Sequence, residues 1–190
     1  MKSLFKISLY TLTAILFCCI SSCMQNATFS EDELRFAKPY SKTDTAIYQS
    51  EKGLVDTIIF QQAIIDTFRP RSIEQGFYNE LTLRVSYKLS TNSYHKLTVF
   101  SKNNEPENFI QFSKAKGSHQ NKEINFLGMN FSDEYVEKID VSNKDEITFR
   151  AENAAYNEAN INEGIKSFVF DFDKGITSFI DINNVKWKLK

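Results

Sequence analysis

Residues 81–87 read Leu-Thr-Leu-Arg-Val-Ser-Tyr, with an apolar side chain at every second position. A β-strand sends successive side chains to opposite faces, so this pattern predicts a strand with one buried and one solvated face. The same alternation returns at residues 168–173, Phe-Val-Phe-Asp-Phe-Asp, and at residues 185–190, Val-Lys-Trp-Lys-Leu-Lys. Three such runs, spread over the chain, indicate a fold built mainly of amphipathic strands.

Further runs have the apolar, β-branched and aromatic content that is typical of strands. They cover residues 46–50, 58–60, 64–65, 94–100, 109–115, 123–129, 135–141 and 146–151. We therefore expect a mainly β protein of about 8–10 strands. An antiparallel sandwich, a barrel and a curled sheet all remain compatible with this spacing of strands and turns.

Three short segments have the composition of tight turns. Glu51-Lys52-Gly53 and Asp173-Lys174-Gly175 each follow a strand run, and glycine in the left-handed region closes such a turn without steric cost. Asn183-Asn184 suits a third turn, because asparagine tolerates positive φ. Residues 152–163 contain four asparagines and predict a loop with at most one helical turn.

The N-terminus has the three parts of an export signal. Lys2 and Lys6 give it a positive start, residues 7–20 are mostly apolar, and Ser21-Ser22 are small. Fourteen helical residues span about 21 Å. A bilayer core is about 30 Å thick, so the run is too short for a comfortable membrane span and suits a signal helix.

Ile20-Ser21-Ser22-Cys23 resembles the lipobox of bacterial lipoproteins. The resemblance implies that a peptidase cuts between Ser22 and Cys23 and that Cys23 then carries lipid. Two or three acyl chains bury enough methylene groups for stable membrane attachment, whereas one chain does not. We expect a signal peptide at residues 1–22, a lipidated tether at residues 23–38 and a single β-rich domain at residues 39–190.

The composition of the chain excludes several classes of site and partner for this domain. The three cysteines of the chain, Cys18, Cys19 and Cys23, all precede residue 24, so the mature domain has neither a disulfide nor a thiolate metal site. Seventeen phenylalanines and eight tyrosines supply material for a core. The net charge of −1 favours neither nucleic acid nor electrostatic attachment to an acidic membrane.

Two features of the expected tether bear on location. Met24 follows the cysteine, and the resemblance to the sorting rule of enteric bacteria implies the outer membrane. Residues 30–33, Ser-Glu-Asp-Glu, resemble the surface-export signal of some Bacteroidota lipoproteins. That signal normally lies nearer the cysteine, and the alternative interpretation is a solvated acidic stretch. We expect a lipid-anchored protein of the cell envelope, in the outer membrane. Its sequence is compatible with both the periplasmic face of that membrane and the cell surface.

A wider resemblance rests on residues 53–58, Gly-Leu-Val-Asp-Thr-Ile, and on the closing run at residues 185–189 with its late Trp187. These segments resemble small uncharacterised lipoproteins of Bacteroidota, in which two hairpins bracket a β-rich domain. The resemblance implies no established activity.

Few residues suggest chemistry. The two histidines, His95 and His119, lack metal-ligand spacing, and no nucleophile elbow or phosphate-binding loop is present. Asp171 and Asp173 lie on one strand face, where a carboxylate pair binds calcium or acts as acid and base, but such a pair more often faces water. Asp171, Asp173 and His95 are therefore weak ligand candidates, and we expect no metal site and no cofactor.

The leading functional interpretation is a non-enzymatic envelope lipoprotein, attached to the membrane through Cys23, that binds another envelope protein, a glycan or a lipid. One alternative is a glycan-active hydrolase or lyase that uses Asp171, Asp173 or His95. Another is a lipid carrier, which predicts a large apolar cavity on the concave side of a curled sheet.

Overall fold

The structure is a computed structural model that describes residues 27–68, 80–90, 106–115, 120–132, 135–136, 138–139, 141, 144–153 and 165–190. The expected signal helix, Ser22, Cys23, His95, His119 and the expected strand at residues 94–100 lie outside these ranges.

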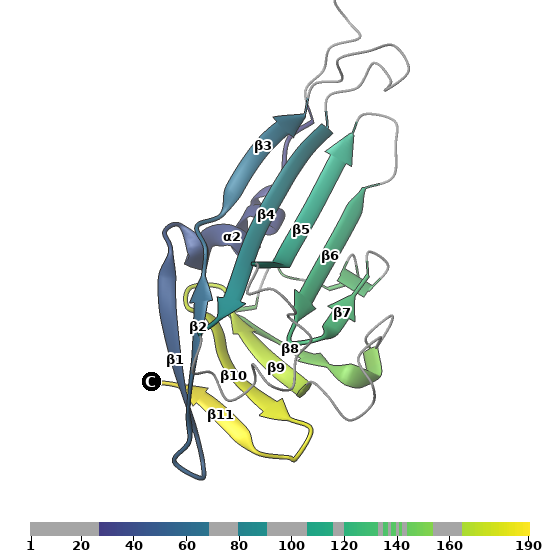
Figure 1. Cartoon of the computed structure of the whole chain (residues 1–190). Coiled ribbons are helices and arrows are strands. Elements are labelled where there is room, and N and C mark those ends of the chain that lie inside the picture. Colours follow the sequence, from purple (N-terminus) through teal and green to yellow (C-terminus); the bar gives the residue numbers. More distant parts are fainter. Residues whose placement is uncertain are drawn as a thin grey trace, which may run out of the picture.

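The described residues form one antiparallel sheet of eleven strands, curled into a half-barrel (Figure 1). The strands are β1 (Asp44–Ser50), β2 (Val55–Phe60), β3 (Ile64–Phe68), β4 (Glu80–Leu89), β5 (Glu107–Ala115), β6 (Asn121–Phe126), β7 (Met129–Phe131), β8 (Glu146–Arg150), β9 (Ile165–Asp171), β10 (Gly175–Asp181) and β11 (Lys186–Leu189). Their order is β7-β6-β5-β4-β2-β1-β11-β10-β9-β8, and β3 pairs with β4 beside this path. The mainly β prediction is confirmed, and the curled sheet is the architecture adopted.

Bulges help the sheet to curl. The pairing of β4 with β5 shifts between Val85 and Ser86, and that of β10 with β9 shifts between Ile176 and Ser178. A bulge increases the local twist of its strand. The two end strands, β7 and β8, come together through side chains, since the Phe131 ring packs 5.0 Å from that of Phe149.

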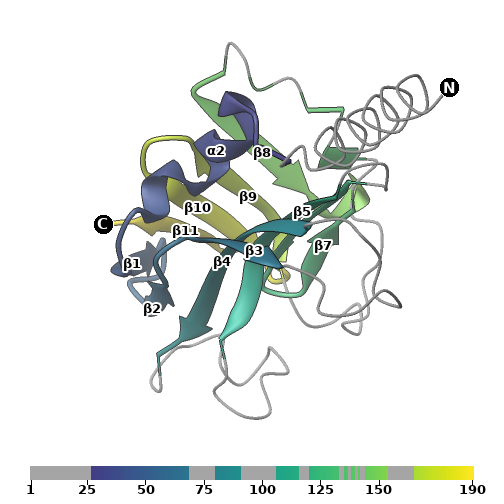
Figure 2. The same cartoon turned by 90° about the horizontal axis from the view of Figure 1, so that it is seen from above.

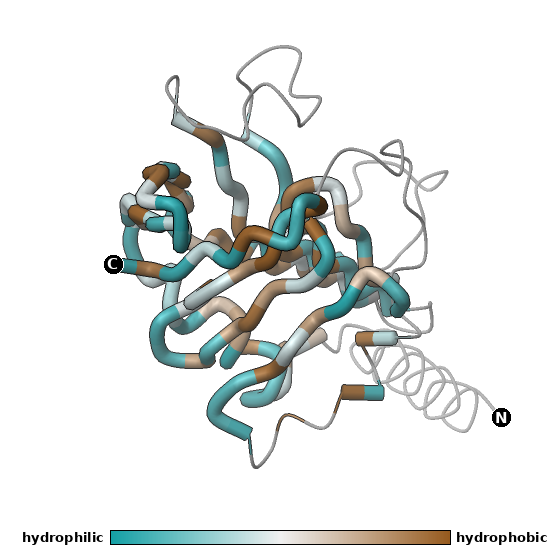
Figure 3. The backbone as a smooth tube through the Cα atoms, turned by 90° about the horizontal axis from the view of Figure 1, so that it is seen from below, coloured by the Kyte–Doolittle hydropathy of each residue, from teal (hydrophilic) through white to brown (hydrophobic). Residues whose placement is uncertain are grey.

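The period-2 pattern divides the sheet into a packed inner face and a polar outer face. On β4, Leu83, Val85 and Tyr87 are buried while Arg84 and Lys88 are exposed, as the alternation predicts. Figure 3 shows the same alternation of hydrophobic and hydrophilic positions along the strands. Aromatic rings from both halves of the sheet meet in the core, including Phe60, Phe109, Phe126, Phe168 and Phe179.

A short helix, α2 (Glu31–Ala37), precedes the sheet and continues into the 3-10 helix η1 (Lys38–Tyr40). It lies on the side toward which the sheet curls (Figure 2). Phe36 packs 5.5 Å from Phe112 of β5 and 5.6 Å from Phe170 of β9, and so joins the two halves of the sheet. The last eight residues of the expected tether at residues 23–38 are therefore helical, and α2 contributes Phe36 to the core.

Two expected strands also differ from the structure. Residues 123–129 are parts of β6 and β7 joined by a two-residue turn, with φ of 47° at Leu127 and 82° at Gly128. The described residues of 135–141 contain a helical turn, in which Val136 N–H donates to Ser132. Both segments mix apolar and polar residues, and local hydrogen bonding rather than alternation decides their shape.

The three tight turns occur where they are expected. Gly53 and Gly175 have φ of 79° and 80°, and Asn184 has φ of 60°. A second short 3-10 helix, η4 (Ala151–Asn153), follows β8 at the start of the expected loop.

Candidate functional site

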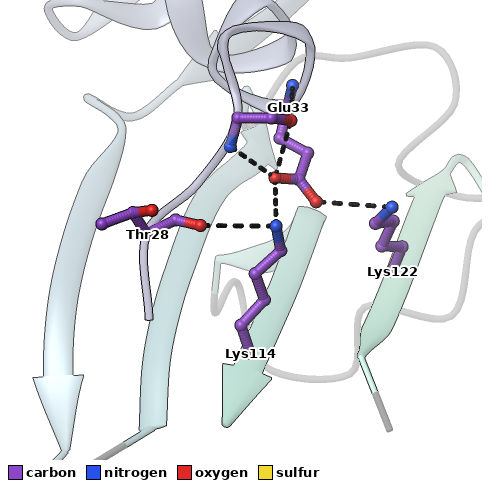
Figure 4. Close-up of polar contacts among 5 residues, drawn as sticks. Thr28, Glu33, Lys114 and Lys122 are labelled. Atoms are coloured by element: carbon purple, nitrogen blue, oxygen red, sulfur yellow. Dashed lines mark hydrogen bonds and ion pairs between the residues drawn. The ribbon is translucent and has the colours of Figure 1, made fainter. Parts of the chain in front are cut away.

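The first described residues are fastened to the sheet by a charged cluster that we call the N-terminal clamp: Glu33, Lys114 and Lys122 (Figure 4). The Lys114 ammonium lies 2.5 Å from one carboxylate oxygen of Glu33, and the Lys122 ammonium lies 3.3 Å from the other. All three side chains are largely buried between α2 and the strands β5 and β6. The clamp therefore joins the N-terminal helix to two neighbouring strands.

Helix capping places Glu33 for this contact. Ser30 is the N-cap of α2 and accepts a hydrogen bond from Glu33 N–H, while the Glu33 carboxylate accepts one from Ser30 N–H. This reciprocal capping box fixes the first turn of the helix. Burial by itself raises the pKa of Glu33, but the hydrogen bonds from Lys114 and Ser30 and the charge of Lys114 outweigh it, so the pKa lies below its ordinary value. Glu33 is thus an anion in the folded protein.

The clamp also determines where the chain leaves the domain. Lys114 Nζ donates to the carbonyl oxygen of Thr28 at 3.4 Å and lies 5.6 Å from the centre of the Phe29 ring. The backbone is therefore held from Thr28 onward. Cys23 precedes Ala27 by four residues, and four extended residues reach at most about 14 Å.

Contacts with the segment before β8 and with the turn after β9 hold the other end of α2. The Arg35 guanidinium donates to the carbonyl oxygens of Val141 and Lys144 and lies 4.3 Å from the centre of the Phe172 ring. The helix is thus attached on both sides and has little freedom to swing away from the sheet.

The predicted ligand candidates Asp171 and Asp173 have separate structural roles. Asp171 Oδ1 accepts the backbone N–H groups of Asp173 and Lys174, and so closes the turn after β9. Asp173 is exposed and pairs with Lys38, whose hydrogen bond and charge lower the pKa of its carboxyl. The structure does not bring the two carboxylates together around a shared site.

A buried carboxylate that the sequence analysis did not single out is Asp181. Its Oδ1 accepts the N–H groups of Asn183 and Val185, and its Oδ2 accepts the indole N–H of Trp187. These bonds satisfy both oxygens inside the core, so Asp181 stabilises the last hairpin.

The described part of the inner face is packed rather than hollow. A pocket of about 250 Å³ reaches Tyr40, Tyr48 and Phe60 of the core. A second pocket, of about 170 Å³, lies on the outer face of β8, β9 and β10. A pocket of about 390 Å³ lies beside β8 and includes the charged side chains of Lys138, Lys144 and Glu146 in its lining. Sites for drug-sized ligands usually occupy 300–1,000 Å³ of mostly apolar space. None of these three pockets is the large apolar cavity that a lipid carrier predicts.

Exposed apolar side chains gather at two places on the sheet. Ile64 and Ile65 lie on β3, which pairs with β4 and with no other strand of the described ranges. Ile47, Leu54 and Val55 lie on the β1–β2 hairpin. Exposed apolar groups of this kind often mark contact surfaces.

Several expectations rest on residues outside the described ranges, including lipidation of Cys23, cleavage after Ser22 and any role for His95. The described residues contain no cluster of three or more histidine, cysteine, aspartate or glutamate side chains placed to hold a metal ion. Among the helices described, none has the length and apolar content needed to cross a bilayer.

Sequence analysis missed the clamp, although one signal for it was present. Ser30 and Glu33 have the Ser-x-x-Glu spacing of a capping box, which predicts a helix start at this point. Their partners Lys114 and Lys122 are distant in sequence and carry no comparable signal. Comparison of the chain with protein-family models, with curated proteins and with solved structures gives no match.

Proposed function

We propose that this protein is a lipid-anchored lipoprotein of the bacterial cell envelope. After cleavage behind Ser22, lipid on Cys23 attaches it to a membrane, and the outer membrane is the location that Met24 favours. The β-rich domain acts as a non-enzymatic binding or structural module that contacts an envelope protein, a glycan or a lipid through its surface.

The observation that carries this proposal is the contact between Lys114 and the backbone of Thr28. The folded part of the chain starts within a few residues of the lipobox. The N-terminal helix packs against the core instead of forming a long stalk, so lipid on Cys23 would hold the domain close to the membrane surface.

The contacts of three carboxylates, those of Glu33, Asp171 and Asp181, support a non-enzymatic role. Glu33 is engaged by two lysines, Asp181 by three N–H groups and Asp171 by a turn. Acid–base catalysis needs a group that is free to exchange a proton with substrate. None of these three is free in that sense, and binding through strand edges and the outer face needs no such group.

Anchoring is tested by growing cells that express the full-length chain with a palmitate analogue. We expect label in the membrane fraction of the wild-type protein and its loss from Cys23→Ala. Ser41→Ala, an exposed serine between η1 and β1, is the matched control and should keep the label. Equal labelling of Cys23→Ala and wild type would refute the anchor.

The non-enzymatic role is tested with the purified mature protein on envelope glycans and their fragments. We expect no turnover. A reproducible turnover that one point substitution abolishes would overturn this part of the proposal.

A further inference from the structure

Two adjacent residues on β3 are the most exposed large hydrophobic side chains among the described residues. Ile64 is 52% exposed and Ile65 is 56% exposed. Because neighbouring strand residues point to opposite faces, the two side chains present apolar surface on both sides of this strand. β3 is also an edge strand: it pairs with β4 on one side, and no described strand pairs with the backbone on its other side.

The strand register places these isoleucines near the point where the chain enters the domain. Ile65 of β3 pairs with Leu83 of β4, and Leu83 pairs with Phe112 of β5. Phe112 pairs in turn with Lys122 of β6, a member of the N-terminal clamp. The next inward-facing row toward the end of the sheet runs from Thr67 through Leu81 to Lys114.

Lys114 binds the carbonyl oxygen of Thr28, so the entry point of the chain lies over that last row. Neighbouring strands are about 4.8 Å apart, which puts Thr67 of β3 about 10 Å from Lys114. Ile65 is two residues further along β3. The distance from both isoleucines to the entry point is therefore similar to the length that the tether can span.

The tether is short. From Ala27 back to Cys23 there are four residues, which reach at most about 14 Å. Lipid on Cys23 would therefore hold the end of the sheet that contains β3 against the bilayer surface.

We propose that Ile64 and Ile65 rest in the interfacial layer of the membrane to which lipidated Cys23 attaches the protein. This inference depends on the proposed anchoring. The partner is the lipid surface itself. At the boundary between headgroups and acyl chains, the apolar area that β3 exposes is removed from water. The contact fixes the orientation of the domain, with β3 toward the membrane.

The β1–β2 hairpin provides an internal comparison. Ile47 and Val55 are 42% and 49% exposed, close to the values on β3. Lys114 pairs with Leu81 of β4, and Leu89, eight residues further along β4, pairs with Ile58 of β2. Val55 is three more residues along β2. The hairpin is therefore roughly 35 Å along the strands from the row of Lys114. Figure 1 shows this hairpin at the opposite end of the sheet from β3. The proposed orientation keeps it in water.

The experiment uses the full-length chain, processed in cells, purified and placed in phosphatidylcholine vesicles. Acylation consumes the thiol of Cys23, so a cysteine introduced by Ile65→Cys or Val55→Cys is the single free thiol for a fluorescent probe. Both positions are exposed, and thermal unfolding of each labelled variant checks that the fold is retained. Quenching is then measured with a nitroxide on the lipid and with iodide in the water.

We expect the probe at position 65 to be quenched at least threefold more strongly by the lipid nitroxide than the probe at position 55, and iodide to act in the opposite order. Strong iodide quenching at both positions, with the protein floating with vesicles, would overturn the membrane contact and leave the anchor intact. Protection of position 65 from both quenchers would mean that protein covers β3, and would also overturn it. Failure to float with vesicles would instead contradict the proposed anchor, from which this inference starts.

Discussion

The carboxylate of Glu33 in α2 lies 2.5 Å from the ammonium of Lys114 in β5, although 81 residues separate them in sequence. Removing one partner of a largely buried ion pair leaves the other charge without compensation. We therefore expect Glu33→Gln to lower the free energy of unfolding by about 2 kcal/mol, measured by urea denaturation.

The exposed pair of Lys38 and Asp173 provides the control. Ion pairs in water contribute little, so Lys38→Met should change stability by less than about 0.5 kcal/mol. Equal effects of the two substitutions would show that the clamp does not fasten the helix.

The same pair predicts a pH dependence. The pKa of Glu33 in the folded protein lies below its ordinary value of 4.5, so the unfolded chain takes up the proton more readily. The stabilisation is complete above pH 4.5 and is lost as the pH falls through the lower folded pKa. The difference in urea midpoint between wild type and Glu33→Gln should shrink between neutral pH and about pH 3. A constant difference over this range would contradict the assignment.

Asp181 is expected to be more important for stability than Asp171. In Asp181→Asn, the remaining side-chain oxygen can still accept the N–H groups of Asn183 and Val185. The new amide group then faces the indole N–H of Trp187, which loses its acceptor. A buried donor without a partner costs about 1–3 kcal/mol. Asp171→Asn retains an oxygen for the two turn N–H groups and should cost less than about 1 kcal/mol. Thermal unfolding of the two variants decides the order, and a reversed order would disprove these roles.

Two buried tyrosines should respond differently to loss of their hydroxyls. Tyr48 donates to the carbonyl oxygen of Ile176 at 2.9 Å. The Tyr40 hydroxyl lies near the backbone of Ile176 but makes no hydrogen bond of ordinary geometry with the described residues. We expect Tyr48→Phe to cost about 1 kcal/mol and Tyr40→Phe to be neutral or stabilising. Chemical denaturation of both variants measures this, and a larger loss for Tyr40→Phe would contradict it.

Alternation in the sequence predicted much of the sheet. The runs at residues 81–87, 168–173 and 185–190 lie wholly or largely in β4, β9 and β11, because one face of each strand is buried in a continuous core. That requirement acts on every second residue and is visible in the sequence without knowledge of neighbours. The curl is different, since it depends on bulges and on which strands pair across the chain.

The N-terminal helix was missed for a physical reason. Seven residues are too few for a clear helical period, and the acidic start of α2 has the composition of a solvated segment. Its stability comes from the capping box and from Phe36, whose partners Phe112 and Phe170 belong to distant strands. Long-range contacts of this kind leave no local pattern.

The candidate site was less predictable than the fold. The carboxylates that alternation singled out, Asp171 and Asp173, close a turn and pair with a lysine. The clamp and the open edge of β3 depend on tertiary placement, which single-sequence patterns do not specify.

Lipid on Cys23 is proposed to hold this domain at a membrane. Mass spectrometry of the N-terminal peptide, taken from full-length protein extracted from the membrane fraction, reads out this modification itself. We expect a mature chain that begins at Cys23 and carries the mass of two or three acyl chains on that residue. A mature chain that begins elsewhere, or an unmodified Cys23, would contradict it.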